Sequence, residues 1–528
     1  MNSLFILFLL LQPIFVYAHG GKHLGKINFT TSANEKAQPL FESGIMQLHS
    51  FEYAEARADF QNAKKADPEF ALAYWGEAMT YNHPLWGEQD YEAALKVLNE
   101  LSPTAQGRVQ KAKTVKEKLL INAVNILYGK GSKKFRDNAY ADAMREIYRQ
   151  YPNDDEIASF YALALLGTTE TKRDMQVYMQ AAGIADEIYS RNPLHPGALH
   201  YAIHSFDDPI HAPLGLRAAR SYAKIAPDAS HALHMPSHIF MAMGMWDDVI
   251  ASNKAAWEVG LKQNVSGNPQ QFTIDDLHAL QWLGYGYLQK QQYHTAYQST
   301  KVMEKIAATA NTPMAKWYYA MLRAAYVSET HDYNADLKSL DMTNIELSAR
   351  ASNLYTDALI ALNQGHGVTD INAAKAILGK LSQSIPKAIR KQDTYQDYFI
   401  SITDSGITAA KIMELELQAH IASREGKIQD AILFLKKAIK LEDKMSFGYG
   451  PPIPVKPASE LLAEYNSQHK QYAAAYQEYF VTLKRMPHRF IAEQGLKLTE
   501  NKLQALGVAV PESIRPYFNR LMLPEFYH

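Results

Sequence analysis

The sequence predicts an all-α fold, a solenoid of antiparallel helix pairs, and three observations carry this prediction. His200 and His234 are 34 residues apart, as are His204 and His238, and 34 residues is the period of a helical-hairpin repeat. Small and large residues recur at fixed offsets in several separate stretches of the chain. Hydrophobic residues make up 47% of the 528 positions, which is enough to bury a continuous core between stacked hairpins.

The first clear copy of the repeat lies near the N-terminus. Residues 37–68 match the tetratricopeptide (TPR) pattern, in which small residues let two antiparallel helices approach and a proline ends the second helix. The matching positions are Gly44, Tyr53, Ala56, Phe60, Ala63 and Pro68. Further copies are expected within 181–193, 244–256, 283–296, 426–438 and 472–487, so the TPR-like solenoid should extend over most of the chain.

The N-terminus predicts export. Leu4 to Val16 is almost continuously apolar, and Val16-Tyr17-Ala18 follows with small residues where a signal peptidase cleaves. The apolar run is too short to span a bilayer comfortably. We therefore expect cleavage, a periplasmic or secreted location, and no stable membrane span after cleavage.

These patterns divide the chain into five segments. They are a signal peptide at 1–18, a flexible N-terminal leader at 19–36, an N-terminal TPR-like solenoid with a histidine-rich groove at 37–310, an irregular helical middle at 311–400, and C-terminal TPR-like repeats at 401–528. The middle is set apart because its helical pattern is out of register with the repeat.

Composition limits the partners and the chemistry. The 54 basic and 55 acidic residues give a net charge of −1, so no basic surface for nucleic acid is expected. The chain has no cysteine, so a bound metal would need nitrogen and oxygen ligands.

The repeat register places six histidines on the concave face of the solenoid. They are His200, His204, His231, His234, His238 and His278. Trp75 and His83 fall on the same face, whereas Tyr74 is expected in the core. Together these side chains predict a ligand groove for a peptide, protein or small molecule, lined by polar and aromatic groups.

A metal site is the alternative for the same residues. Histidines four positions apart lie on one helix face, and neighbouring helices pack at about 8–10 Å, so imidazoles from two hairpins can reach one ion. The predicted ligands are His200, His204, His234 and His238, with Asp208 as a ligand or base, and the ion would be zinc (Zn) or copper (Cu). Asp207 is a candidate acceptor for an outer imidazole nitrogen. A chance cluster is the third possibility.

Pro236 decides how regular this face is. In strict register it lies inside a helix, so the helix either begins late or is kinked there. A late start would move His231 and His234 into a loop.

Several motifs together resemble a family of exported bacterial TPR-containing proteins. The motifs are Phe29-Thr30-Thr31-Ser32, Leu48-His49-Ser50-Phe51, Ala73-Tyr74-Trp75-Gly76-Glu77-Ala78-Met79, His195-Pro196-Gly197-Ala198 through His204, His234-Met235-Pro236-Ser237-His238-Ile239 and Gly450-Pro451-Pro452-Ile453-Pro454-Val455-Lys456. The resemblance runs from about residue 29 to about 490. It implies export, a TPR-like fold and the histidine motifs as a signature, and it brings no established activity and no catalytic residue.

No nucleophile elbow, phosphate-binding loop or His-Glu-x-x-His motif occurs in the sequence. We therefore predict a binding or scaffold protein rather than an enzyme. The alternative is a metal-binding protein or a metal-dependent hydrolase with its histidine site between adjacent repeats.

Overall fold

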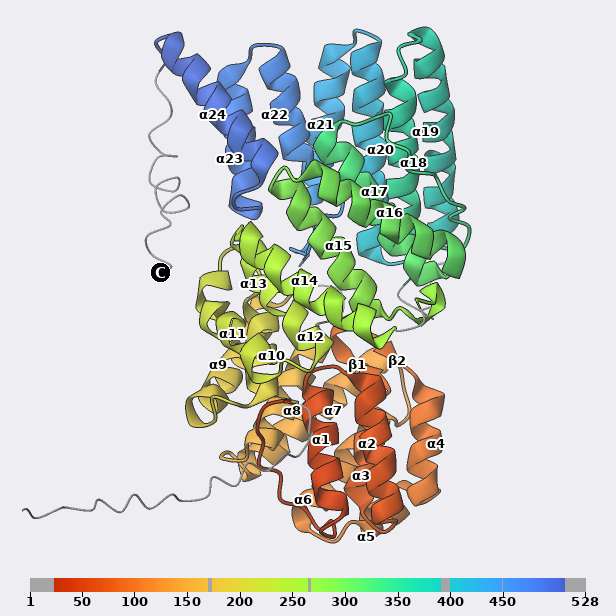
Figure 1. Cartoon of the computed structure of the whole chain (residues 1–528), viewed down its shortest axis with the longest axis vertical. Helices are drawn as coiled ribbons and strands as arrows, with labels where there is room; N and C mark the ends of the chain where they lie inside the picture. The colour runs from red at the N-terminus through yellow and green to blue at the C-terminus, as the bar shows by residue number, and fades with distance from the viewer. Residues whose placement is uncertain (1–22, 170–172, 265–266, 391–398, 449, 509–528) are drawn as a thin grey trace, which may run out of the picture.

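The fold is all-α, as predicted, in the computed structural model shown in Figure 1. The structure describes residues 23–169, 173–264, 267–390, 399–448 and 450–508, so the predicted signal peptide at 1–18 lies outside the described residues. Within those ranges the strands are limited to β1 (Asn82–His83) and β2 (Glu88–Gln89), an antiparallel pair around the short 3-10 helix η1 (Pro84–Trp86).

The N-terminal half stacks helices in chain order, each packed against the helix before it. They are α1 (Ala37–His49), α2 (Tyr53–Ala66), α3 (Ala71–Met79), α4 (Tyr91–Leu101), α5 (Ala105–Lys111), α6 (Val115–Leu127), α7 (Lys133–Gln150), α8 (Asp155–Gly167), α9 (Met175–Arg191), α10 (Pro196–Phe206), α11 (Ala212–Ile225), α12 (Ser230–His234) and α13 (Pro236–Ala242). In Figure 1 this half runs from red to yellow in the lower part of the molecule.

The C-terminal half continues the series above it. Its helices are α14 (Trp246–Gln263), α15 (Ile274–Gln289), α16 (Tyr293–Ala310), α17 (Pro313–Thr330), α18 (Leu347–Leu362), α19 (Val368–Ile389), α20 (Asp404–Arg424), α21 (Ile428–Glu442), α22 (Ala458–Gln468), α23 (Tyr472–Arg485) and α24 (Phe490–Ala505), with the 3-10 helix η2 (Pro269–Gln271) before α15. Helices α14 and α15 lie in the middle of the molecule in Figure 1, where the C-terminal half begins.

The glycines of the repeat pattern explain how the first hairpin packs. The ring of Phe60 on α2 lies against Gly44 on α1 and Gly76 on α3. A Cβ atom would come within 2.7 Å of this ring at Gly44 and within 2.5 Å at Gly76. Small residues at these offsets are therefore required for the three helices to pack around one aromatic side chain.

Residues 23–36 form a packed segment in place of the flexible leader we expected. Leu24 and Phe29 are buried in the core, and the Phe29 ring lies 5.4 Å from that of Phe41. Ser32 donates its backbone N–H and its hydroxyl to the Glu117 carboxylate, at 2.7 and 2.9 Å. Apolar burial and hydrogen bonds to a buried carboxylate hold this stretch on the solenoid.

The segment expected to be an irregular middle contains regular helices. Its pattern is out of register because α17 and α18 are separated by residues 331–346, a connection without a helix.

Pro236 divides one helical stretch into α12 and α13. Met235 keeps a helical conformation between them (φ −53°, ψ −37°), so the chain is interrupted without a late start. Proline has no N–H to donate to the preceding turn, which accounts for the break. His231 and His234 consequently remain on a helix. Within the described ranges, none of the helices is both long and apolar enough to cross a membrane.

Candidate metal centre

Six histidines converge where α10, α12, α13 and α15 meet. His200 and His204 come from α10, and the ring of His204 lies 5.2 Å from that of His238 on α13. On the other side, the ring of His234 lies 4.6 Å from that of His278 on α15. We call His200, His204, His231, His234, His238 and His278 the six-histidine cluster.

The cluster is buried, whereas the sequence predicted a groove lined by these side chains. His200, His204, His231, His234 and His238 are 0–6% exposed, and His278 is partly buried. Two aromatic rings form much of the wall around them. The ring centre of Phe51, between α1 and α2, lies 4.3 Å from that of His200. The ring centre of Trp282 on α15 lies 4.6 Å from that of His238. The imidazoles are therefore surrounded by apolar groups and shielded from solvent.

Oxygen acceptors fix the tautomers of the imidazoles. His200 Nδ1 lies 2.6 Å from the backbone carbonyl of His49, and His231 Nδ1 lies 2.9 Å from Asp275 Oδ1. Because a carbonyl or carboxylate oxygen only accepts, Nδ1 must carry the proton in both rings. Nε2 then presents a lone pair, and neither His200 Nε2 nor His231 Nε2 has a hydrogen-bond partner within the described part of the chain.

His234 and His238 show the same arrangement in a closer contact. His234 Nδ1 lies 2.6 Å from Asn253 Oδ1, and Asn253 Nδ2 donates to Val249 O, which fixes the orientation of that amide. His238 Nδ1 lies 3.1 Å from Asp207 Oδ2. Both protons thus sit on Nδ1, and the two Nε2 atoms face each other at 3.1 Å. Two lone pairs at this distance repel unless a cation lies between them.

Asp207 is the buried carboxylate that organises one side of the cluster. Its Oδ1 lies 2.5 Å from an Arg173 nitrogen, and its Oδ2 contacts His238 and lies 3.5 Å from His204 Nδ1. Burial opposes ionisation of Asp207, but Arg173 and the two imidazoles outweigh it and lower its pKa. The carboxylate is therefore a permanent acceptor for the outer nitrogens.

Burial keeps four of the imidazoles neutral. Burial lowers the pKa of His204 to about 4 although Asp207 opposes the shift. Burial, together with neighbouring histidines, also lowers the pKa values of His200, His234 and His278 well below their usual range. Neutral imidazole is the form that binds a transition metal.

The ligand atoms form two triads made of histidine alone, and a third group of His204, Asp207 and His238 overlaps both. One nitrogen each of His200, His204 and His231 lie within 4.8 Å of one another, and the same holds for His234, His238 and His278. The predicted set of His200, His204, His234 and His238 is thus distributed over both triads. His231 and His278, expected only in the ligand groove, supply the third imidazole of each.

Asp208 lies outside this arrangement, in contrast to its predicted role as a ligand or base. Its carboxylate contacts His211 Nδ1 at 2.8 Å and Arg173 at 3.4 Å, and it accepts from backbone N–H groups at the start of α11. Asp207, one residue earlier, is the residue that faces the histidines.

Trp75 and His83 are also placed differently from the prediction. Trp75 is fully buried, and its ring centre lies 5.1 Å from that of Phe160. Tyr74, which we expected in the core, is partly exposed. His83 lies in β1 because α3 ends at Met79, and it stacks on Tyr53 at 4.0 Å. The early end of α3 accounts for the position of His83, whereas Tyr74 and Trp75 lie within α3 and differ from the prediction in which of the two faces the core.

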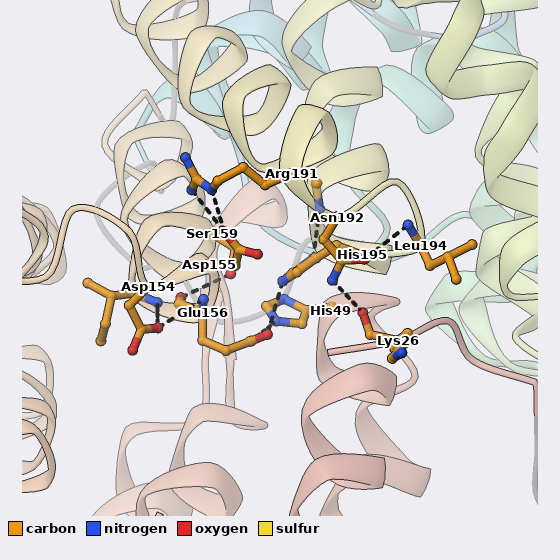
Figure 2. A network of polar contacts seen from close by, with 12 residues as sticks. Lys26, His49, Asp154, Asp155, Glu156, Ser159, Arg191, Asn192, Leu194 and His195 are labelled. Atoms are coloured by element: carbon orange, nitrogen blue, oxygen red, sulfur yellow. Dashed lines mark hydrogen bonds and ion pairs between the residues drawn. The ribbon is translucent and has the colours of Figure 1, made fainter. Parts of the chain in front are cut away.

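A second histidine site lies beside the cluster and differs in its chemistry. Figure 2 shows the buried Glu156 carboxylate reaching His49 and His195, at 2.7 and 3.0 Å. The remaining nitrogens are also engaged: His49 Nδ1 contacts the Tyr201 hydroxyl, and His195 Nδ1 accepts from Ala198 N–H. Every nitrogen has a partner, so this network is a satisfied structural core rather than a set of converging lone pairs.

Several contributors were not predicted from the sequence. Glu156 follows Asp155 in the first turn of α8, where acidic residues are common in any helix. Phe51 appeared only in the motif Leu48-His49-Ser50-Phe51, and Asn253 only within the repeat copy at 244–256. Their roles depend on contacts between segments that are distant in the sequence, such as the contact of His49 with His200, 151 positions apart.

Comparisons with known proteins give only weak likenesses. No protein-family model matches the chain, and no curated protein matches it. The TPR domain of P58(IPK) is 14% identical, with 89% of this chain and 99% of that chain covered and a TM-score of 0.23. Yeast Tom70 is 12% identical, with coverages of 92% and 99% and a TM-score of 0.32. A monomeric mutant of IFIT1 with Gppp-AAAA is 13% identical, with coverages of 90% and 88% and a TM-score of 0.38. At these values the likenesses carry no statement about binding or activity.

Proposed function

We propose that this protein binds a transition-metal ion in its six-histidine cluster. The observation that carries the proposal is the 3.1 Å contact between His234 Nε2 and His238 Nε2. With zinc–nitrogen bonds of about 2.0–2.1 Å, two nitrogens on one tetrahedral ion lie about 3.3 Å apart, so this contact suits a shared ion.

A shared proton is the competing explanation for the contact. It would require one imidazole to become a cation in a buried site, where the pKa values of both rings are lowered, chiefly by burial. A metal ion instead binds the neutral tautomers that Asn253 and Asp207 already select, so neither imidazole has to gain a proton. The geometry therefore favours a metal over a proton.

The other predicted roles receive less support from the geometry. A groove that recognises a peptide through these histidines needs exposed imidazoles, and five of the six are at most 6% exposed. The hydrolase alternative used Asp208 as a base, and that carboxylate faces His211 and Arg173 instead. Export remains a separate proposal, supported by the apolar run at 4–16, and N-terminal sequencing of the secreted chain tests it.

Metal analysis of protein purified without a histidine tag tests the proposal. We expect zinc or copper to remain bound after gel filtration, and to be lost in a His234→Gln, His238→Gln double variant that keeps its helical circular dichroism. The matched control is His366→Gln, a histidine whose side chain is 69% exposed. Protein that stays metal-free after incubation with zinc and with copper would exclude the proposed function.

A further inference from the structure

The cluster contains more ligand atoms than one ion can use. We propose that it holds a pair of ions, one in the triad of His200, His204 and His231 and one in the triad of His234, His238 and His278, and that the pair is monovalent copper. This inference rests on the proposed function and extends it to the number and class of ions.

The first triad has its own evidence for a ligand. His200 Nε2 and His231 Nε2 are buried lone pairs without a partner in the described part of the chain, and both rings are held by oxygen acceptors on Nδ1. A buried acceptor of this kind is costly unless it is satisfied. The two rings come from different helices, α10 and α12, and one nitrogen of each lies within 4.8 Å of a nitrogen of His204.

The two triads are built in the same way. Each takes two histidines four positions apart, His200 with His204 and His234 with His238, and a third from another helix. Helix α12 contributes to both, since His231 belongs to one triad and His234 to the other. The short distance of 5.2 Å between the rings of His204 and His238 places the two triads side by side.

Charge selects the class of ion. An imidazole binds a metal ion as a neutral ligand, and the carboxylates bonded to outer nitrogens of the cluster are Asp207 and Asp275. Arg173 offsets part of the charge of Asp207, and the Glu52 carboxylate accepts from the backbone N–H of His231. Asp207, Asp275 and Arg173 together carry a charge of −1. Two divalent ions would add four positive charges to this buried aromatic site, whereas two monovalent ions add two, so the monovalent pair leaves much less charge uncompensated.

Copper suits this ligand set on chemical grounds as well. Imidazole is a good ligand for copper, and the six histidines supply it without any thiolate. A three-nitrogen site without a carboxylate ligand is also unsuited to magnesium or calcium, which prefer oxygen.

Anaerobic titration of the full-length apoprotein tests the inference, with copper supplied as its acetonitrile complex. We expect two Cu(I) ions per chain after gel filtration and no more than one Zn(II) ion in a parallel titration. His231→Gln and His278→Gln should each retain one Cu(I), and His366→Gln should retain two. Circular dichroism of each variant separates loss of an ion from loss of the fold.

The possible outcomes separate the two proposals. A single Cu(I) per chain in the parent protein would overturn the pair and leave the proposed function in place. Two Zn(II) ions would overturn the selection by charge. No binding of either metal would overturn both proposals.

Discussion

Replacing Asp207 with asparagine tests whether the carboxylate controls the ligand atoms. The Asp207→Asn amide has one acceptor and one donor group. If its oxygen stays on Arg173, its NH2 group faces His238 Nδ1, which also carries a proton. The ring relieves this clash by moving its proton to Nε2, the atom that faces His234. The substitution therefore blocks a metal ligand without touching it directly.

Two magnitudes follow from these contacts. Loss of an outer partner of a metal-binding histidine costs about 10–100-fold in affinity, so we expect metal binding to weaken by that factor. Breaking a buried ion pair costs about 3–5 kcal/mol. We expect about 3 kcal/mol for the apoprotein, since Arg173 keeps a 3.4 Å contact with Asp208 and a hydrogen bond to Ser205 O.

Competition with a chromophoric chelator measures the affinity, and urea denaturation of the apoprotein measures the stability. Asp208→Asn is the matched control, because that carboxylate faces His211 and Arg173, and it should keep the parent affinity. An Asp207→Asn variant that is folded and binds metal as tightly as the parent would refute the tautomer argument.

Three further predictions follow from other parts of the molecule. A Cβ atom at Gly197 would lie 2.6 Å from His49 Nδ1, so Gly197→Ala should lower the unfolding free energy by about 1–3 kcal/mol. The control Gly183→Ala, where a Cβ atom would have nothing within 4 Å, should raise the unfolding free energy by about 0.5–1 kcal/mol. Urea denaturation measures both variants, and equal effects would contradict the packing at Gly197. Burial, with Lys456 and Arg424, lowers the pKa of His420 to about 3, so its stabilising contribution is complete above about pH 6.5 and is lost as the pH falls toward 3. Between pH 6 and 4 the unfolding free energy of the parent should therefore fall by up to about 1.4 kcal/mol per pH unit more than that of His420→Gln. Parallel profiles of unfolding free energy against pH would refute this. At free metal 100 times the dissociation constant, loading should stabilise the parent by about 2.7 kcal/mol over the chelated form in calorimetry, with no such gain in His234→Gln, His238→Gln.

The architecture was largely accessible from the sequence because repeat spacing reports helix packing directly. Gly44 and Phe60 stand at their pattern offsets since one ring must fit against small residues on two helices. The pattern failed where a helix length departed from the repeat, as at His83, which follows the early end of α3.

The candidate site was predicted in its residues more than in its geometry. The spacing of His200 and His204 and of His234 and His238 identified the imidazoles, and all four belong to the cluster. The division into triads depends on α12 and α15, whose positions follow from tertiary packing. The choice between Asp207 and Asp208 depends on how the chain turns after α10, and no spacing rule reports this turn.

The most direct measurement is the anomalous scattering of metal-loaded crystals at the absorption edge of the bound metal. We expect a peak about 2.0–2.1 Å from both His234 Nε2 and His238 Nε2, with a second peak in the triad of His200, His204 and His231 when copper is loaded anaerobically. Peaks absent from both triads, or found only at His49, Glu156 and His195, would contradict it.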